Sequence, residues 1–94
     1  MFASANGNMN FARAYHTATL LGDGTELVTG GYDGTRVLTA AEIYDPIGHS
    51  FTRTADMTVT RSHHTATLLK DGSVLVTGGV AGRGAYVSSA ELYK

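Results

Sequence analysis

The chain has 94 residues and a mass of 9.9 kDa, which is enough for one small domain. Its 7 Lys and Arg against 8 Asp and Glu give a formal net charge of −1, which argues against a binder of nucleic acid or of membrane surfaces. The absence of cysteine excludes disulfides, thiolate metal sites and cysteine nucleophiles. The apolar runs are too short to predict a transmembrane helix, and the first residues show no signal-peptide pattern.

The sequence contains two copies of one unit about 48 residues long. Residues 13–31 and 61–79 are identical at 14 of 19 positions. Residues 41–44 return as 90–93 with an offset of 49, so one residue is inserted in the connection before them. Self-similarity of this kind is the signature of a repeat architecture.

The first copy predicts four short strands, because β-branched and apolar residues alternate with turn residues. Asp23-Gly24 favours a two-residue type I′ hairpin turn after the first strand, and Asp45-Pro46 ends the third. The second copy repeats the first three strands, the last over 89–93. Four short antiparallel strands in 48 residues are typical of a propeller blade. The strands expected in the first copy cover residues 17–21, 27–29, 40–44 and, more weakly, 51–57.

A double glycine follows the second strand of each copy, as Gly30-Gly31 and Gly78-Gly79. We expect these positions to need a positive φ or a close approach of backbone, so that a side chain is not tolerated there.

Together these motifs resemble the kelch repeat. The resemblance rests on Val-Thr-Gly-Gly, on Tyr-Asp-Pro after the third strand, on Phe51 and on the Met57 to Arg61 spacing. The segment His-Thr-Ala-Thr-Leu-Leu is similar to blades of bacterial relatives of the galactose oxidase propeller. The sequence departs from the family at Phe51, where tryptophan is usual, and at Lys94, where the first copy has Asp45.

The resemblance implies an all-β fold of two four-stranded antiparallel blades. Blade 1 is expected over about 10–57, and blade 2 over about 58–94, completed by strand 2–9 of a neighbouring copy. Two blades cannot close a ring, so this permuted N-terminal strand requires other chains or further blades. Three chains would give six blades, and four chains eight. The sequence is also compatible with a fragment of a longer propeller, or with a two-blade monomer of marginal stability.

Several residues recur in both copies and are expected to be structural. The simplest interpretation of Arg13 and Arg61 with Glu42 and Glu91 is ion pairs between blades. His16 and His64 are expected to bond to the backbone or a carboxylate of a neighbouring blade, although in a ring they would form a circle around the channel. A metal or anion site there is the competing hypothesis. Adjacent His63 and His64 would point to opposite faces of a strand and cannot chelate one ion together.

The copies differ in the loops between their second and third strands and just before their first. By the resemblance, this is where kelch propellers bind ligands, and variable loops on a constant scaffold commonly carry function. The competing interpretation is that these are solvated turn residues. The candidate binding residues are Tyr15, Ser62, His63, Tyr32, Asp33, Arg36, Arg83 and Tyr86.

Catalysis finds little support in the sequence. The copper cofactor of galactose oxidase requires a cross-linked cysteine, which this chain lacks, and neither a nucleophile elbow nor a phosphate-binding glycine loop is present. The sequence therefore predicts a non-enzymatic interaction module without a cofactor, which binds a protein or glycan and self-assembles head to tail. The alternatives are a fragment of a larger secreted propeller enzyme or carbohydrate-active protein, and an engineered repeat without a ligand.

Overall fold

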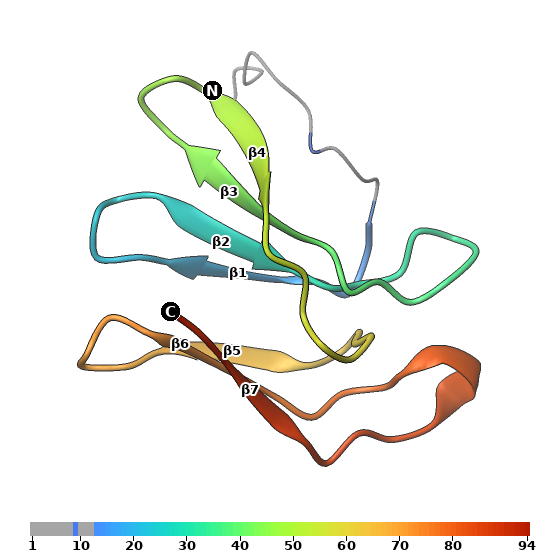
Figure 1. The fold of residues 1–94 in the computed structure, drawn as a ribbon. Helices are drawn as coiled ribbons and strands as arrows, with labels where there is room; N and C mark the ends of the chain where they lie inside the picture. The colour runs from blue at the N-terminus through green and yellow to red at the C-terminus, as the bar shows by residue number, and fades with distance from the viewer. Residues whose placement is uncertain (1–8, 10–12) are drawn as a thin grey trace.

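A computed structural model describes Met9 and residues 13–94 and contains two antiparallel sheets (Figure 1). The first has the order β1-β2-β3-β4 and the second the order β5-β6-β7. The first sheet comprises β1 (Thr17–Leu20), β2 (Glu26–Thr29), β3 (Ala41–Asp45) and β4 (Ser50–Thr54). The second comprises β5 (Thr65–Leu68), β6 (Val74–Thr77) and β7 (Ala90–Tyr93), and a short 3₁₀ turn covers Gly82–Gly84. The all-β prediction of two blade-like sheets is confirmed.

The strand order follows the chain, as expected for a blade, but two predicted strands need comment. β4 ends at Thr54 and does not reach Met57, because the backbone N–H of Met57 leaves the sheet edge and donates to the carbonyl of Thr39 at 2.9 Å. Residues 2–8 of the strand expected over 2–9 lie outside the described residues.

The hairpin turn between β1 and β2 differs from the prediction. Leu21 N donates to Thr25 O and Gly24 N to Leu21 O, so the loop has three residues instead of two. Only Gly24 has a positive φ, of 90°, whereas a type I′ turn needs two such residues. The longer loop is stabilised by Asp23, whose Oδ1 accepts hydrogen bonds from the N–H and the hydroxyl of Thr25.

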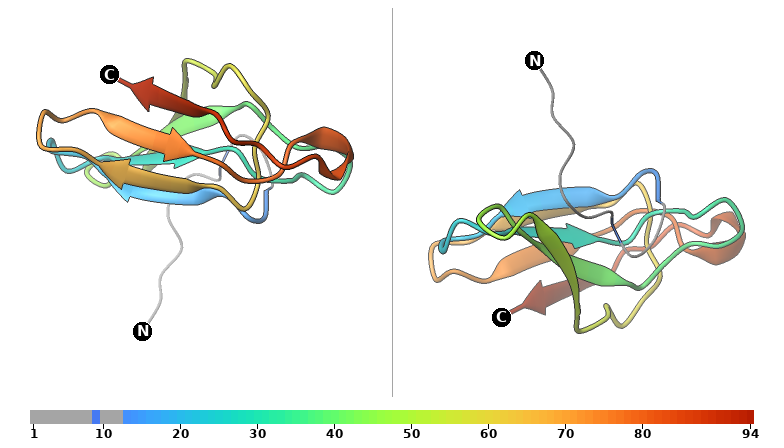
Figure 2. Two further views of the ribbon diagram at one scale, coloured as in Figure 1. Left: turned by 90° about the horizontal axis from the view of Figure 1, so that it is seen from below. Right: turned by 90° about the horizontal axis from the view of Figure 1, so that it is seen from above.

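The two sheets stack face to face, with β1 and β5 side by side (Figures 1 and 2). Leu27 and Ala41 of the first sheet form a core cluster with Val74 and Val76 of the second, and all four are at most 2 % exposed. The hydrophobic core therefore lies between the blades and not within either one. Among the described residues no helix is long and apolar enough to cross a membrane.

Candidate interaction surface

A buried arginine clamps each blade at the point where β1 or β5 begins. In the first blade Arg13 Nη1 donates to the carbonyls of Gly30 at 2.9 Å and Ala40 at 3.0 Å, and Nη2 lies 2.6 Å from Glu42 Oε2. Both side chains of this ion pair are fully buried. The clamp therefore joins the chain before β1 to the end of β2 and the start of β3.

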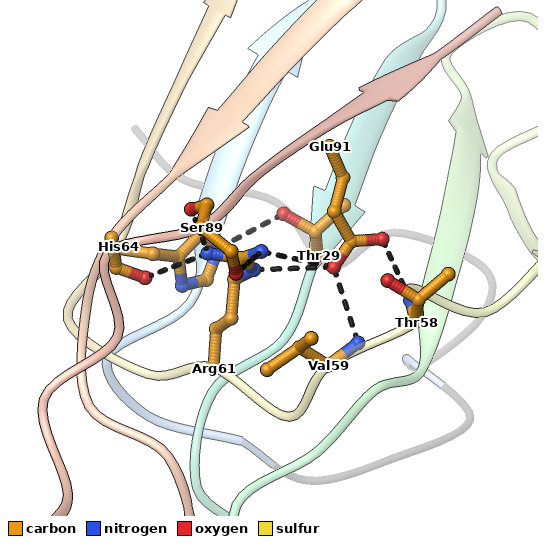
Figure 3. Close-up of polar contacts among 8 residues, drawn as sticks. Thr29, Thr58, Val59, Arg61, His64, Ser89 and Glu91 are labelled. Carbon is orange, nitrogen blue, oxygen red and sulfur yellow. Dashed lines mark hydrogen bonds and ion pairs between the residues drawn. The ribbon is translucent and has the colours of Figure 1, made fainter.

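The second blade repeats the clamp with equivalent residues (Figure 3). Arg61 Nη1 donates to the carbonyls of Gly78 and Ser89, and its Nη2 lies 3.1 Å from Glu91 Oε2. The predicted ion pairs form, but the expectation that they lie between blades is wrong. The strand register brings each arginine to the carboxylate of its own blade.

Glu91 also fixes the connection that leads from one blade to the next (Figure 3). Its carboxylate accepts backbone N–H groups from Thr58 at 2.6 Å and Val59 at 3.1 Å. Burial alone would raise the pKa of Glu91, but these hydrogen bonds and that from Arg61 outweigh burial and lower it. The carboxylate is therefore charged at neutral pH and holds the linker against β7.

His64 forms a buried polar contact between the blades. Its Nε2 lies 3.0 Å from both Thr17 Oγ1 and Thr29 Oγ1, which are 2.7 Å from each other on the first sheet. Burial first, then the charge of Arg61, lowers the pKa of His64 to about 4, so the imidazole is neutral at pH 7. The structural role expected at a neighbouring blade is present: threonine hydroxyls are the hydrogen-bond partners, and a contact with the backbone of Thr29 partly opposes the lowering of the pKa.

His16 occupies the equivalent position in the first blade. Its side chain is exposed, and burial followed by the charge of Arg13 lowers its pKa. Within the described part of the chain no three His, Cys, Asp or Glu side chains gather as they would to hold a metal ion.

The double glycines have the positive φ angles that the sequence predicts. A Cβ at Gly30 (φ 65°) would overlap the carbonyl oxygen of Arg61 and lie 2.7 Å from His64 Cε1, both on the next blade. At Gly78 (φ 68°) the nearest atom would be 3.6 Å away. The close approach at Gly30 is therefore a contact between blades, and the matching contact is absent at Gly78 among the described residues.

The two long loops lie on the same side of the molecule, opposite the hairpin turns (Figure 1). They border a hollow of about 440 Å³ that brings Tyr32 and Arg36 of one loop together with Arg83 of the other. Asp33 does not line this hollow. Its Oδ1 accepts the N–H groups of Arg36 and Thr35, which lowers the pKa of Asp33 and shapes the first loop.

Tyr15 and His63 form a second group beside the loops. Their rings stack with centroids 4.0 Å apart, and both have positive φ angles, 59° and 55°, which are unusual for residues with side chains. Tyr15 is 58 % exposed. Ser62, in contrast, is buried, and its hydroxyl contacts the Val80 carbonyl and His63 Nδ1, so it supports the pair from below and is not itself exposed.

Tyr86 stands apart from both groups, at 92 % exposed and outside the hollow. The structure thus arranges the predicted binding residues as the two-arginine hollow and the stacked Tyr15–His63 pair.

Each blade has two faces, which the strand registers define. We call face A the side that looks toward the next blade along the chain, and face B the opposite side. Face A of the first blade is covered by face B of the second through the core cluster and the His64 contacts. Face A of the first blade carries Thr17, Thr19, Leu21, Leu27, Thr29, Ala41 and Ile43. Face B of the second carries His64, Ala66, Leu68, Val74, Val76, Glu91 and Tyr93.

The two remaining faces are not covered by another blade among the described residues, although Val28 and Glu42 on face B of the first blade are themselves buried. Face B of the first blade has a hollow of about 270 Å³ lined by Met9, His16, Ala18, Glu26, Val28, Tyr44 and Phe51. On face A of the second blade Leu92 is 50 % exposed, although Leu27 on the covered face is fully buried. The sequence predicts an apolar face from Ala18, Leu20, Leu27, Val28 and Ile43 together, but the register divides them. Ala18, Leu20 and Val28 lie on face B, whereas Leu27 and Ile43 lie on face A.

These features define a class, an all-β protein made of propeller blades with arginine clamps. The sequence profile of the kelch motif matches residues 12–58, which contain β1 to β4, and the chain belongs to the kelch-repeat family. A search of curated proteins found no match to the chain. The kelch motif indicates a propeller module for protein interaction.

Proposed function

We propose that the chain is a non-enzymatic kelch building block. Copies assemble head to tail into a closed propeller, which presents the variable loops to a protein or glycan ligand. The observation that carries this proposal is that the two uncovered faces repeat the two faces already packed together inside the chain.

Face A of the second blade is nearly the same surface as the covered face A of the first. Six of its seven positions have the same residue, and the seventh has Leu92 in place of Ile43. Thr65 Oγ1 and Thr77 Oγ1 lie 2.9 Å apart, in the arrangement by which Thr17 and Thr29 receive His64. The second blade therefore presents the same apolar and hydroxyl groups to a further blade.

Face B of the first blade supplies the complementary surface. His16, Ala18, Leu20, Val28, Glu42 and Tyr44 match the residues by which the second blade covers the first, with Glu26 as the exception. In a second copy, His16 would reach the Thr65–Thr77 pair, and the backbone before β1 would approach the open position at Gly78. Each blade would then make the contact that is already present once within the chain.

The head-to-tail contact is between two different faces, so each addition leaves the same two faces open, and a ring forms when the rotation between successive copies brings the last face back to the first. Three or four copies would give six or eight blades, within the usual range for propellers. The segment over 2–9 precedes β1 in the sequence as β4 precedes β5, so in such a ring we expect it to add the fourth strand beside β7 of the preceding copy.

The loop surface is the proposed ligand site. The two-arginine hollow and the stacked Tyr15–His63 pair offer aromatic and guanidinium groups, which are enriched at interaction hot spots. Replacing Arg36 and Arg83 with alanine is expected to abolish any binding found on glycan or peptide arrays while leaving the assembly mass unchanged. Retained binding would place the ligand elsewhere.

Two variants, each blocked on one face, test the assembly. Ala18→Arg fills the hollow on face B, and Leu92→Arg places a charge on face A. We expect light scattering to give monomers for each variant alone and dimers for their equimolar mixture, because one intact interface then remains. Ile47→Arg, at a residue 90 % exposed and on neither face, is the control that should assemble like the parent chain.

Other outcomes would contradict the proposal. If both variants assemble normally, the faces do not dock. The parent chain alone could form only polydisperse aggregates. If extending the chain with further kelch blades then abolishes this aggregation, the alternative of a fragment from a larger propeller is favoured.

A further inference from the structure

We propose that an ion pair between Lys70 of one copy and Glu26 of the next joins the copies and has no counterpart within the chain. This inference rests on the proposed self-assembly and names a pair of residues that would favour the head-to-tail contact between copies. It starts from the positions at which the otherwise equivalent interfaces differ.

Two charged departures occur close to the packed faces of the repeats. Glu26 on face B of the first blade stands where the second has Val74, and Lys70 of the second hairpin turn stands where the first has Gly22. The first departure adds a negative charge to one uncovered face, and the second adds a positive charge beside the other.

The interface within the chain shows that these two positions are neighbours. A hollow of about 440 Å³ between the blades is lined by Gly22 of the first blade and by Gly72 and Tyr93 of the second. Tyr93 is the cross-strand partner of Val74, and Gly72 lies two residues before Val74 in the sequence. Gly22 and Val74 therefore lie at the same corner of the interface, on opposite blades.

Transferring this geometry to the interface between copies brings Lys70 and Glu26 to that corner. The space exists, because a Cβ built at Gly22 would meet no atom within 4 Å. Neither Glu26 nor Lys70 forms an ion pair with another described residue, so both charges are available.

The charges around the corner also favour the pair. Asp71, next to Lys70, is held in its own turn, where its Oδ1 accepts the N–H and hydroxyl of Ser73. Lys94 lines the hollow within the chain. Its equivalent in the first copy, Asp45, accepts the N–H of Ile47 in its own turn. A lysine side chain entering between two copies would thus meet Glu26, whereas within the chain it would meet Lys94.

Charge reversal tests the inference. Glu26→Lys and Lys70→Glu should each raise the concentration at which copies assemble by about tenfold, as like charges then meet at a partly buried contact. The double variant should return the midpoint to within about threefold of the parent chain. Sedimentation velocity over a concentration series measures the midpoint, and Lys70→Glu with Ile47→Lys, which adds a positive charge at a residue 90 % exposed and on neither face, is the mismatched control that should show no rescue.

The failures are distinguishable. A parent chain that assembles, with single effects that simply add in the double variant, would overturn the ion pair and leave the assembly proposal standing. A parent chain that stays monomeric at every concentration would overturn both. Thermal unfolding of each variant at low concentration should match the parent chain, because the pair is absent from the monomer.

Discussion

His64 Nε2 of the second blade lies 3.0 Å from Thr29 Oγ1 of the first, a buried polar contact between two sheets whose core cluster is apolar. The imidazole must be neutral for this buried position, and burial lowers its pKa to about 4. Blade packing is therefore linked to pH through one residue.

The first prediction concerns acid stability. The unfolded chain binds a proton on His64 near pH 6.5, whereas the folded chain resists protonation until about pH 4. The stabilisation is therefore complete above pH 6.5, is lost as the pH falls from 6.5 to about 4, and does not change further below that. Thermal unfolding at pH 7.5, 6, 5 and 4.5 should show the midpoint falling across this range.

His64→Gln is the control for this window, because glutamine keeps a donor without titrating. The variant should lose the part of the pH dependence that comes from His64. The part that comes from His16, whose pKa is also lowered, should remain. Carboxylates with lowered pKa values act separately, because their stabilisation is lost only below their ordinary pKa near 4. An unchanged pH profile in the glutamine variant would show that His64 does not govern it. The carboxylates concerned are Asp23, Asp33, Asp71 and Glu91.

The second prediction compares equivalent threonines. Thr29→Val removes a hydroxyl that His64 contacts and should lower the free energy of unfolding by about 1 kcal/mol. Thr77→Val, at the same position on the uncovered face, should change the stability of the monomer far less but weaken assembly. Equal effects of the two substitutions on the monomer would contradict the assignment of the faces.

The third prediction compares the glycines of the two copies. Gly30→Ala combines a positive φ with overlap on the backbone of Arg61, so we expect a loss of about 3 kcal/mol or more. Gly78→Ala meets only the strain of its φ, for which about 1 kcal/mol is expected. Chemical denaturation of the two variants measures the difference, and a smaller loss at Gly30 would disagree with the close approach of the blades.

The fourth prediction concerns the clamp of the second blade. Glu91→Gln removes the charge opposite fully buried Arg61 and weakens the hold on Thr58 and Val59. Leaving a buried guanidinium without its carboxylate should lower the free energy of unfolding by about 3 kcal/mol. Asp56→Asn, in the exposed pair with Arg53, is the matched control and should cost less than about 1 kcal/mol.

Much of the fold could be predicted from the sequence, since the repeat and the alternation of apolar residues place the strands. The turn after β1 was assigned wrongly because Asp-Gly suits two loop geometries, and the side chain of Asp23, bonded to Thr25, favours the longer one. The repeat likewise shows that an arginine and a glutamate occur in each copy, but it does not show whether Arg61 pairs with the glutamate of its own blade or of the other blade.

The candidate site was only partly predictable for the same reason. Loop divergence identified Tyr32, Arg36 and Arg83, but a single strand pattern does not show that Ser62 is buried. The role of Thr29 as a partner of His64 was missed, although its recurrence as Thr77 was a signal. Long-range register decides these contacts, and it is not encoded in local propensity.

The strand expected over 2–9, of which residues 2–8 lie outside the described residues, leads to a further test. Deleting residues 2–9 should abolish assembly and leave an aggregating or unfolded chain, since β7 would then lack a fourth strand and keep an exposed edge. A truncated chain with the mass and melting behaviour of the parent would show that the segment completes no blade.

The most direct test of the central claim is the absolute molar mass of the parent chain in solution, measured by light scattering on the eluting peak. Head-to-tail assembly predicts one species at three or four times 9.9 kDa. A folded monomer at 9.9 kDa that persists at high concentration would contradict the claim, because both uncovered faces would then remain in contact with water.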